Sequence, residues 1–155
     1  MSGDGVDDAR DLEHLRAALA EAAAARTAGD PPFGSVLVDG AGRTIGRARN
    51  TTVTEGDIAA HPELTLARLA AQQLTREEAA AATLYTSCEP CPMCANAIAR
   101  AAIGRVVFAL STQQLTELKP TGYQNPDAAV ATYVGPVLLD EARAAVGDYY
   151  GTAAG

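Results

Sequence analysis

The residues of this chain with the clearest capacity for chemistry fall into two short groups. His61 and Glu63 are separated by one residue, and Cys91 and Cys94 form a C-x-x-C pair. One histidine and two cysteines make three zinc ligands, and three protein ligands leave a fourth position open for water, as in catalytic zinc sites. Zinc lowers the pKa of water from about 15.7 to roughly 7, and Glu63 is the candidate general acid and base.

Each group taken alone has a less specific interpretation. The pattern H-x-E arises often by chance, and a C-x-x-C pair can instead be a redox pair. A zinc-stabilised binding module without enzymatic activity would use a fourth protein ligand, for which Cys88 is the candidate. We expect Cys88 to be a small buried residue on the pocket floor instead, because it precedes Pro90 at a strand end.

The composition bounds the class of protein. With 155 residues, of which 48% are hydrophobic, the chain has the size of one domain, expected over 7–150 after a disordered tail at 1–6. A net charge of −7 argues against a nucleic-acid partner. No apolar run approaches the roughly 20 residues of a membrane span. The clustered cysteines, in a chain without a secretory signal, favour a cytoplasmic location.

Hydrophobic periodicity predicts the elements that must position these residues. Strands that alternate with helices predict an α/β fold, a three-layer α/β/α arrangement with a central mixed sheet of about five strands. Both metal-binding groups fall at helix N-termini, whose partial positive charge favours thiolates. The predicted helices are 7–28, 62–74, 93–102, 112–118 and 140–146, and the predicted strands are 33–39, 44–50, 82–86, 105–110 and 133–139.

With these motifs and this order of elements, the chain resembles the cytidine/deoxycytidylate deaminase superfamily over roughly residues 8–112. An H-x-E motif followed by P-C-x-x-C, here His61 to Glu63 and Pro90 to Cys94, is the signature of zinc nucleobase deaminases. The stretch LYTSCEPCPMC, which ends at Cys94, looks most like bacterial guanine deaminases. The resemblance implies the cytidine-deaminase-like version of the expected fold.

The resemblance also implies the activity. It points to a zinc-dependent hydrolytic deaminase that acts on a nucleobase or a related aminated heterocycle and releases ammonia. Guanine is the favoured substrate, which would connect the enzyme to purine metabolism, and a homodimer is implied. Cytosine, a nucleoside or a tRNA adenosine are the alternative substrates on the same fold, although a tRNA enzyme usually has a basic surface.

Substrate contacts are implied in several segments. Asn50 matches an asparagine that hydrogen-bonds the substrate, and its amide offers both a donor and an acceptor, although without the resemblance it would be interpreted as a turn residue. A C-terminal cap is also implied, with a frayed terminus as the alternative. The remaining expected contacts are Phe33, Cys88 and Glu89 near the pocket and Asp148, Tyr149 and Tyr150 in the cap, with Tyr123 and Asp127 as further candidates.

Pro62 departs from the family's pattern, in which alanine usually stands between the histidine and the glutamate. A backbone N–H at that position can face the substrate in relatives of this fold, and proline has none. We therefore expect Pro62 to contact the substrate and the pocket to select its substrate differently from an ordinary guanine deaminase.

Overall fold

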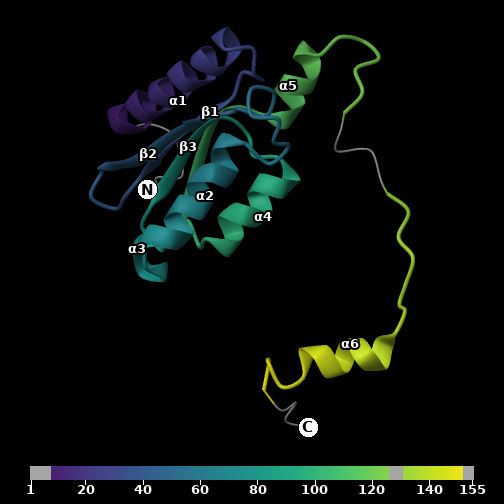
Figure 1. Cartoon of the computed structure of the whole chain (residues 1–155). Coiled ribbons are helices and arrows are strands. Elements are labelled where there is room, and N and C mark those ends of the chain that lie inside the picture. The colour runs from purple at the N-terminus through teal and green to yellow at the C-terminus, as the bar shows by residue number, and fades with distance from the viewer. Residues whose placement is uncertain (1–7, 126–130, 152–155) are drawn as a thin grey trace. The chain divides into compact units, whose positions relative to one another are not determined.

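The protein is described by a computed structural model that places residues 8–125 and 131–151 (Figure 1). The chain divides into two compact units, one up to Lys119 and the other from Pro120 onwards. The first unit holds a β-sheet with its helices, and the second holds helix α6 (Leu139–Val146).

The sequence led us to expect a disordered tail, a single domain and no membrane span. The tail expected at 1–6 lies outside the described residues, and the single domain expected over 7–150 stays a prediction. In the part of the chain that the structure describes, no helix is long and apolar enough to cross a membrane.

The sheet has four strands among the described residues, in the spatial order β2-β1-β3-β4. Strand β1 pairs antiparallel with β2 and β3, whereas β3 and β4 are parallel, so the predicted mixed sheet is confirmed. The central strands β1 and β3 are almost entirely buried. The bounds are Gly34–Val38 for β1, Thr44–Arg49 for β2, Thr83–Cys88 for β3 and Arg105–Leu110 for β4.

Helices cover both faces of this sheet, which confirms the predicted three layers. Helix α1 (Ala9–Thr27) lies on one face, and α2 (Pro62–Gln73) and α4 (Pro92–Arg100) lie on the other (Figure 1). The α1 backbone approaches β1 closely because Gly34 has no side chain. A Cβ atom at Gly34 would collide with the carbonyl oxygen of Ala18.

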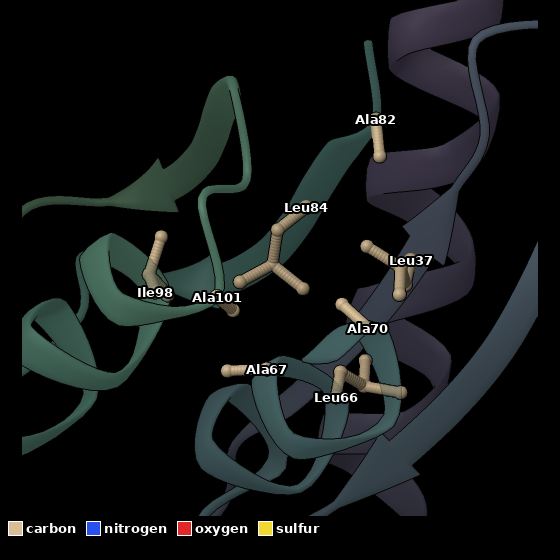
Figure 2. Close-up of a cluster of buried hydrophobic side chains, with 8 residues drawn as sticks. All are labelled: Leu37, Leu66, Ala67, Ala70, Ala82, Leu84, Ile98 and Ala101. Atoms are coloured by element: carbon tan, nitrogen blue, oxygen red, sulfur yellow. The ribbon is translucent and has the colours of Figure 1, made fainter. Parts of the chain in front are cut away.

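The core has one cluster on each face of the sheet. Figure 2 shows the cluster beneath α2 and α4, where small alanines let the helix backbones approach the leucines of β1 and β3. The two clusters bury their apolar side chains almost completely, which is the main favourable term in folding. They comprise Leu37, Leu66, Ala67, Ala70, Ala82, Leu84, Ile98 and Ala101 on this face, and Leu15, Ala18, Val36, Val38, Tyr85 and Val107 beneath α1.

A buried carboxylate fastens α1 to the sheet. Asp11 is 5% exposed, accepts two hydrogen bonds from Arg105 at 2.9 and 2.7 Å, and accepts a third from the Tyr85 hydroxyl at 2.6 Å. The Arg105 guanidinium and the Tyr85 hydroxyl lower the pKa of Asp11 from 3.8 to about 2. Burial and the bond to Asp11 raise the pKa of Tyr85 to about 12. The network joins α1 to β3 and β4.

The structure differs from the predicted elements in three places. The predicted strand at 133–139 is wrong: Pro136 has no N–H for a ladder, Leu138 has a left-handed φ of 54°, and α6 begins at Leu139. Strand β3 extends two residues past the predicted end, to Cys88. The unpredicted helix α3 (Arg76–Ala80) begins with a capping box, whereas α5 (Thr112–Leu118) lies where it was predicted.

Candidate active site

Two helix starts position the predicted metal ligands. His61 is the N-cap residue of α2 and Cys91 is the N-cap residue of α4, and a proline follows each of them. Proline is well suited to a first helical position because its missing N–H would have no intrahelical partner there. Since α2 and α4 pack side by side on one face of the sheet (Figure 1), their N-termini bring the two segments together.

The three ligand atoms are spaced for a single ion. The Nδ1 atom of His61 lies 3.7 Å from Sγ of Cys91 and 3.5 Å from Sγ of Cys94. All three ligand atoms lie within 4.8 Å of one another. Zinc bonds of about 2.1 Å to nitrogen and 2.3 Å to sulfur place neighbouring tetrahedral ligands roughly 3.6 Å apart. His61, Cys91 and Cys94 are therefore positioned to hold a metal ion, and their donor set suits zinc.

The two thiols are not equivalent. Hydrogen bonds with Cys94 and His61 lower the pKa of Cys91 to about 4. The hydrogen bond to Cys91, together with burial, raises the pKa of Cys94. Metal ligands bind as thiolates, so binding of a cation by Cys91 and Cys94 would release the protons of these thiols.

Glu63 lies in the first turn of α2, two residues after His61, and is 5% exposed. Its Oε1 atom accepts a hydrogen bond of 2.7 Å from the Thr86 hydroxyl of β3. Helix α2 therefore presents a metal ligand and a buried carboxylate from the same turn. This placement is what a general acid and base beside a metal-activated water requires.

A cavity of about 80 Å³ adjoins these residues. It lies where the start of β1, the end of β2 and the end of β3 meet the starts of α2 and α4. All substrate contacts that were predicted within the first unit line this one cavity. Its lining consists of Phe33, Asn50, His61, Pro62, Glu63, Cys88, Glu89 and Cys91.

Asn50 is 3% exposed and has a determined orientation. Its Oδ1 atom accepts hydrogen bonds from the backbone N–H of Thr52 at 2.9 Å and from the Thr52 hydroxyl at 2.8 Å. A backbone N–H requires an acceptor, so the amide oxygen has to face Thr52. The NH₂ group is left as the part of Asn50 that can serve a substrate. Asn50 was expected to offer a substrate both a donor and an acceptor, but in this orientation it offers only the donor.

Cys88 and Glu89 line the cavity in different ways. Cys88 is 5% exposed, and burial raises the pKa of its thiol. Among the described residues the ligand atoms grouped within 4.8 Å of one another are those of His61, Cys91 and Cys94, so Cys88 lies on the pocket floor outside this set. Glu89 is exposed, and its Oε1 atom accepts a hydrogen bond from the backbone N–H of Thr112 at 3.0 Å. One of its oxygens is therefore committed to the start of α5.

The residues expected in a C-terminal cap belong to the second unit. Tyr149 and Tyr150 are 81% and 87% exposed and contact each other edge to face, and Asp148 is also exposed. Tyr123, in the same unit, is 51% exposed, and Asp127 lies outside the described residues. Their contact with a substrate stays a prediction.

Two positions at the site were not predicted. Thr86 contacts Glu63, and Asp30 holds the segment between Asn50 and His61. Asp30 is 5% exposed and accepts hydrogen bonds from the N–H groups of Val53 and Thr54 and from the Thr54 hydroxyl, at 2.8–2.9 Å. Burial alone would raise the pKa of Asp30, but these hydrogen bonds together outweigh burial and hold the pKa below its ordinary value. The available signal for Thr86 was a hydroxyl inside an apolar strand.

Comparisons with known proteins place this arrangement among its relatives. The family described as "Cytidine and deoxycytidylate deaminase zinc-binding region" matches residues 8–110. A probable cytosine deaminase of Schizosaccharomyces pombe is 34% identical over 145 residues, covering 86% of this chain and 88% of that protein. A tRNA-specific adenosine deaminase of Haemophilus influenzae is 39% identical over 101 residues, 65% of this chain and 58% of that protein. The solved structure of guanine deaminase from Bacillus subtilis superposes with a TM-score of 0.66 at 30% identity, covering 86% of this chain and 91% of that one.

Proposed function

Because this chain belongs to the cytidine and deoxycytidylate deaminase family and is a zinc-dependent deaminase, we propose that it deaminates a free nucleobase, with guanine as the favoured substrate. The observation that carries the proposal is the single small cavity in which a buried carboxylate, a fixed amide donor and the metal ligands meet. With guanine as substrate the enzyme would act in purine metabolism.

The reaction is the exchange of an amine for a carbonyl oxygen. Zinc held by His61, Cys91 and Cys94 supplies the Lewis acidity that makes water acidic near neutral pH. Glu63 accepts a proton from the attacking water and delivers it to a ring nitrogen. It later carries the second water proton to the departing amine, which leaves as ammonia as the carbon–nitrogen bond breaks. Base and water thus become the oxo base and ammonia.

The remaining lining residues orient the substrate. The NH₂ group of Asn50 donates to an acceptor on the heterocycle, a carbonyl or an unprotonated ring nitrogen. Phe33 offers an apolar surface to the ring, and Pro62 and Cys88 close the cavity. A volume of about 80 Å³ is well below the roughly 300–1,000 Å³ of sites for drug-sized ligands, so the cavity suits a group no larger than a single base, whether free or part of a larger molecule.

The proposal is tested by Glu63→Gln in zinc-loaded protein. Ammonia release should fall at least ~100-fold while zinc content stays at one ion per chain, and Glu13→Gln, on the exposed surface of α1, should behave like wild type. Loss of zinc in Glu63→Gln would assign Glu63 a ligand or structural role. Zinc-loaded wild type that is inert toward all bases, nucleosides and a tRNA anticodon stem would support a binding module instead.

Cytosine is the second candidate substrate. The probable cytosine deaminase of Schizosaccharomyces pombe is similar to this chain over 86% of its length. Cytosine also presents a carbonyl oxygen to a donor such as Asn50. A tRNA substrate is supported by a relative that is 39% identical but opposed by a net charge of −7. Ratios of kcat/KM for guanine, cytosine and the anticodon stem decide among them.

The assembly and location are further proposals. We keep the homodimer that the resemblance implies, and analytical ultracentrifugation of the zinc-loaded protein tests it. The cytoplasmic location rests on the clustered cysteines and their proposed role in holding zinc. Fractionation of cells that express the full chain tests this location.

A further inference from the structure

A chain of three buried side-chain oxygens ends on the proposed catalytic carboxylate. The Ser35 hydroxyl donates to Oγ1 of Thr86 at 2.8 Å, and the Thr86 hydroxyl donates to Oε1 of Glu63 at 2.7 Å. Ser35 and Thr86 are fully buried, and Glu63 is 5% exposed. Ser35 and Thr86 are directly opposed in the antiparallel pairing of β1 with β3, so the sheet itself holds the two hydroxyls in register.

The direction of this chain follows from the number of hydrogens. Thr86 has one hydroxyl hydrogen, and an ionised Glu63 can only accept, so that hydrogen points to Oε1. The lone pairs of Thr86 then accept from Ser35. The carbonyl oxygen of Gly34 also lies near Oγ1 of Thr86, but at 3.5 Å it competes poorly with a carboxylate at 2.7 Å. Consecutive hydrogen bonds of one direction polarise and strengthen each other.

The location of the pair argues against a general role in packing. Burying a hydroxyl among apolar side chains costs free energy unless it finds a partner. Two positions along the strands, on the same face, lie the buried leucines Leu37 of β1 and Leu84 of β3. Two apolar side chains would fill the same space without that cost. The gain from keeping two hydroxyls here lies at the far end of the chain, at Glu63.

We propose that Thr86, supported by Ser35, is a positioning residue that holds the Oε1 atom of Glu63. With Oε1 held, Oε2 is the oxygen that carries protons between water, the ring nitrogen and the departing amine. This inference rests on the proposed acid and base role of Glu63. Free rotation of the carboxylate would move the proton-carrying atom away from its path, and misplacement by about 1 Å can cost on the order of 100-fold in rate.

The experiment compares Thr86→Val, Thr86→Ser and the pair Ser35→Ala/Thr86→Val in zinc-loaded enzyme. Thr86→Val should lower kcat roughly 10- to 100-fold with KM within about twofold, and Thr86→Ser should recover kcat because it keeps the hydroxyl. The double variant removes both buried donors, so it should be more thermally stable than Thr86→Val yet equally slow. Thr83→Val, the same change at the start of β3, is the matched control.

A readout without turnover completes the test. In a crystal structure of Thr86→Val, or of the double variant if the single one fails to fold, the Glu63 carboxylate should occupy more than one orientation. Wild-type kcat in Thr86→Val, equal losses in Thr86→Val and Thr86→Ser, or an unmoved carboxylate would each overturn the inference. These outcomes differ from failure of the proposed function, which would appear as an active Glu63→Gln enzyme.

Discussion

The Nδ1 atom of His61 lies 3.5 Å from the Sγ atom of Cys94, although 33 residues separate them in the chain. His61 lies at the start of α2 and Cys94 in the first turn of α4. The two helix starts meet because β3, which lies between α2 and α4 in the sequence, brings the chain back to the same edge of the sheet. The metal-binding site thus depends on the packing of α2 against α4. Neither helix supplies three ligands by itself.

Replacing a ligand should remove zinc. His61→Ala, Cys91→Ala and Cys94→Ala are each expected to lower zinc affinity more than ~100-fold, because even the outer partners of metal ligands contribute about 10- to 100-fold. Metal analysis after dialysis against a weak chelator measures the loss. Cys88→Ala is the control and should keep one zinc per chain. Equal zinc loss in Cys88→Ala would show that Cys88 is a ligand.

Pro62→Ala should change the preference among substrates. Pro62 is buried, lines the cavity and occupies the first position of α2, so the variant adds an N–H beside the substrate. One net hydrogen bond corresponds to about 2- to 10-fold, which should appear in the ratios of kcat/KM across a panel of bases. Pro92→Ala changes the equivalent position of α4, which is exposed and outside the cavity lining, and should leave the ratios unchanged. The same profile in both variants contradicts a selective role for Pro62.

Asp30→Ala should weaken substrate binding through the segment it holds. Without the carboxylate, Val53 and Thr54 lose three hydrogen bonds. The segment after Asn50 then loosens, and with it Thr52, which holds the amide oxygen of Asn50. We expect KM to rise by roughly 10-fold and proteases to cut within 51–60 faster. Asp30→Asn keeps an oxygen that can accept from both N–H groups, so its KM should stay closer to wild type. Matching KM values for Asp30→Ala and wild type would exclude this role.

Stability at acid pH should depend on Asp11. Because its pKa falls from 3.8 unfolded to about 2 folded, the stabilisation is complete above about 3.8 and is lost as pH falls toward 2. The shift corresponds to about 2 kcal/mol at most, since the Arg105 side chain is 43% exposed. Urea unfolding of wild type and Asp11→Asn across this range should give a shallower pH dependence for the variant. If the free energy of unfolding of wild type and of Asp11→Asn changed with pH in the same way, Asp11 would contribute nothing to the pH dependence.

The parts of the fold that sequence could predict are those set by local chemistry. Helix starts at His61 and Cys91 are marked by the following prolines, and apolar runs mark β1 and β4. The strand predicted over 133–139 is wrong because a run of apolar residues says nothing about a pairing partner, and Pro136 and the left-handed Leu138 interrupt it.

The residues of the site likewise fall into a group that sequence could predict and a group that it could not. The metal ligands and Glu63 are identified by spacing within two short motifs. The supports of the site depend on distant partners: Ser35 and Thr86 are 51 residues apart, and Asp30 and Thr54 are 24 apart. Which hydroxyl meets which carboxylate is decided by strand register and loop path, so these contacts become visible only in three dimensions.

The fastening of α1 by Asp11 has a consequence for how the protein is made. Arg105 follows Asp11 by 94 residues, and ribosomes add about 5–20 residues per second. Asp11 of α1 is therefore synthesised roughly 5 to 20 s before the Arg105 guanidinium that binds it. By the end of that interval His61, Cys91 and Cys94 have all been synthesised. Nascent chains that end before Arg105 should therefore leave α1 open to proteases, and longer chains should protect it.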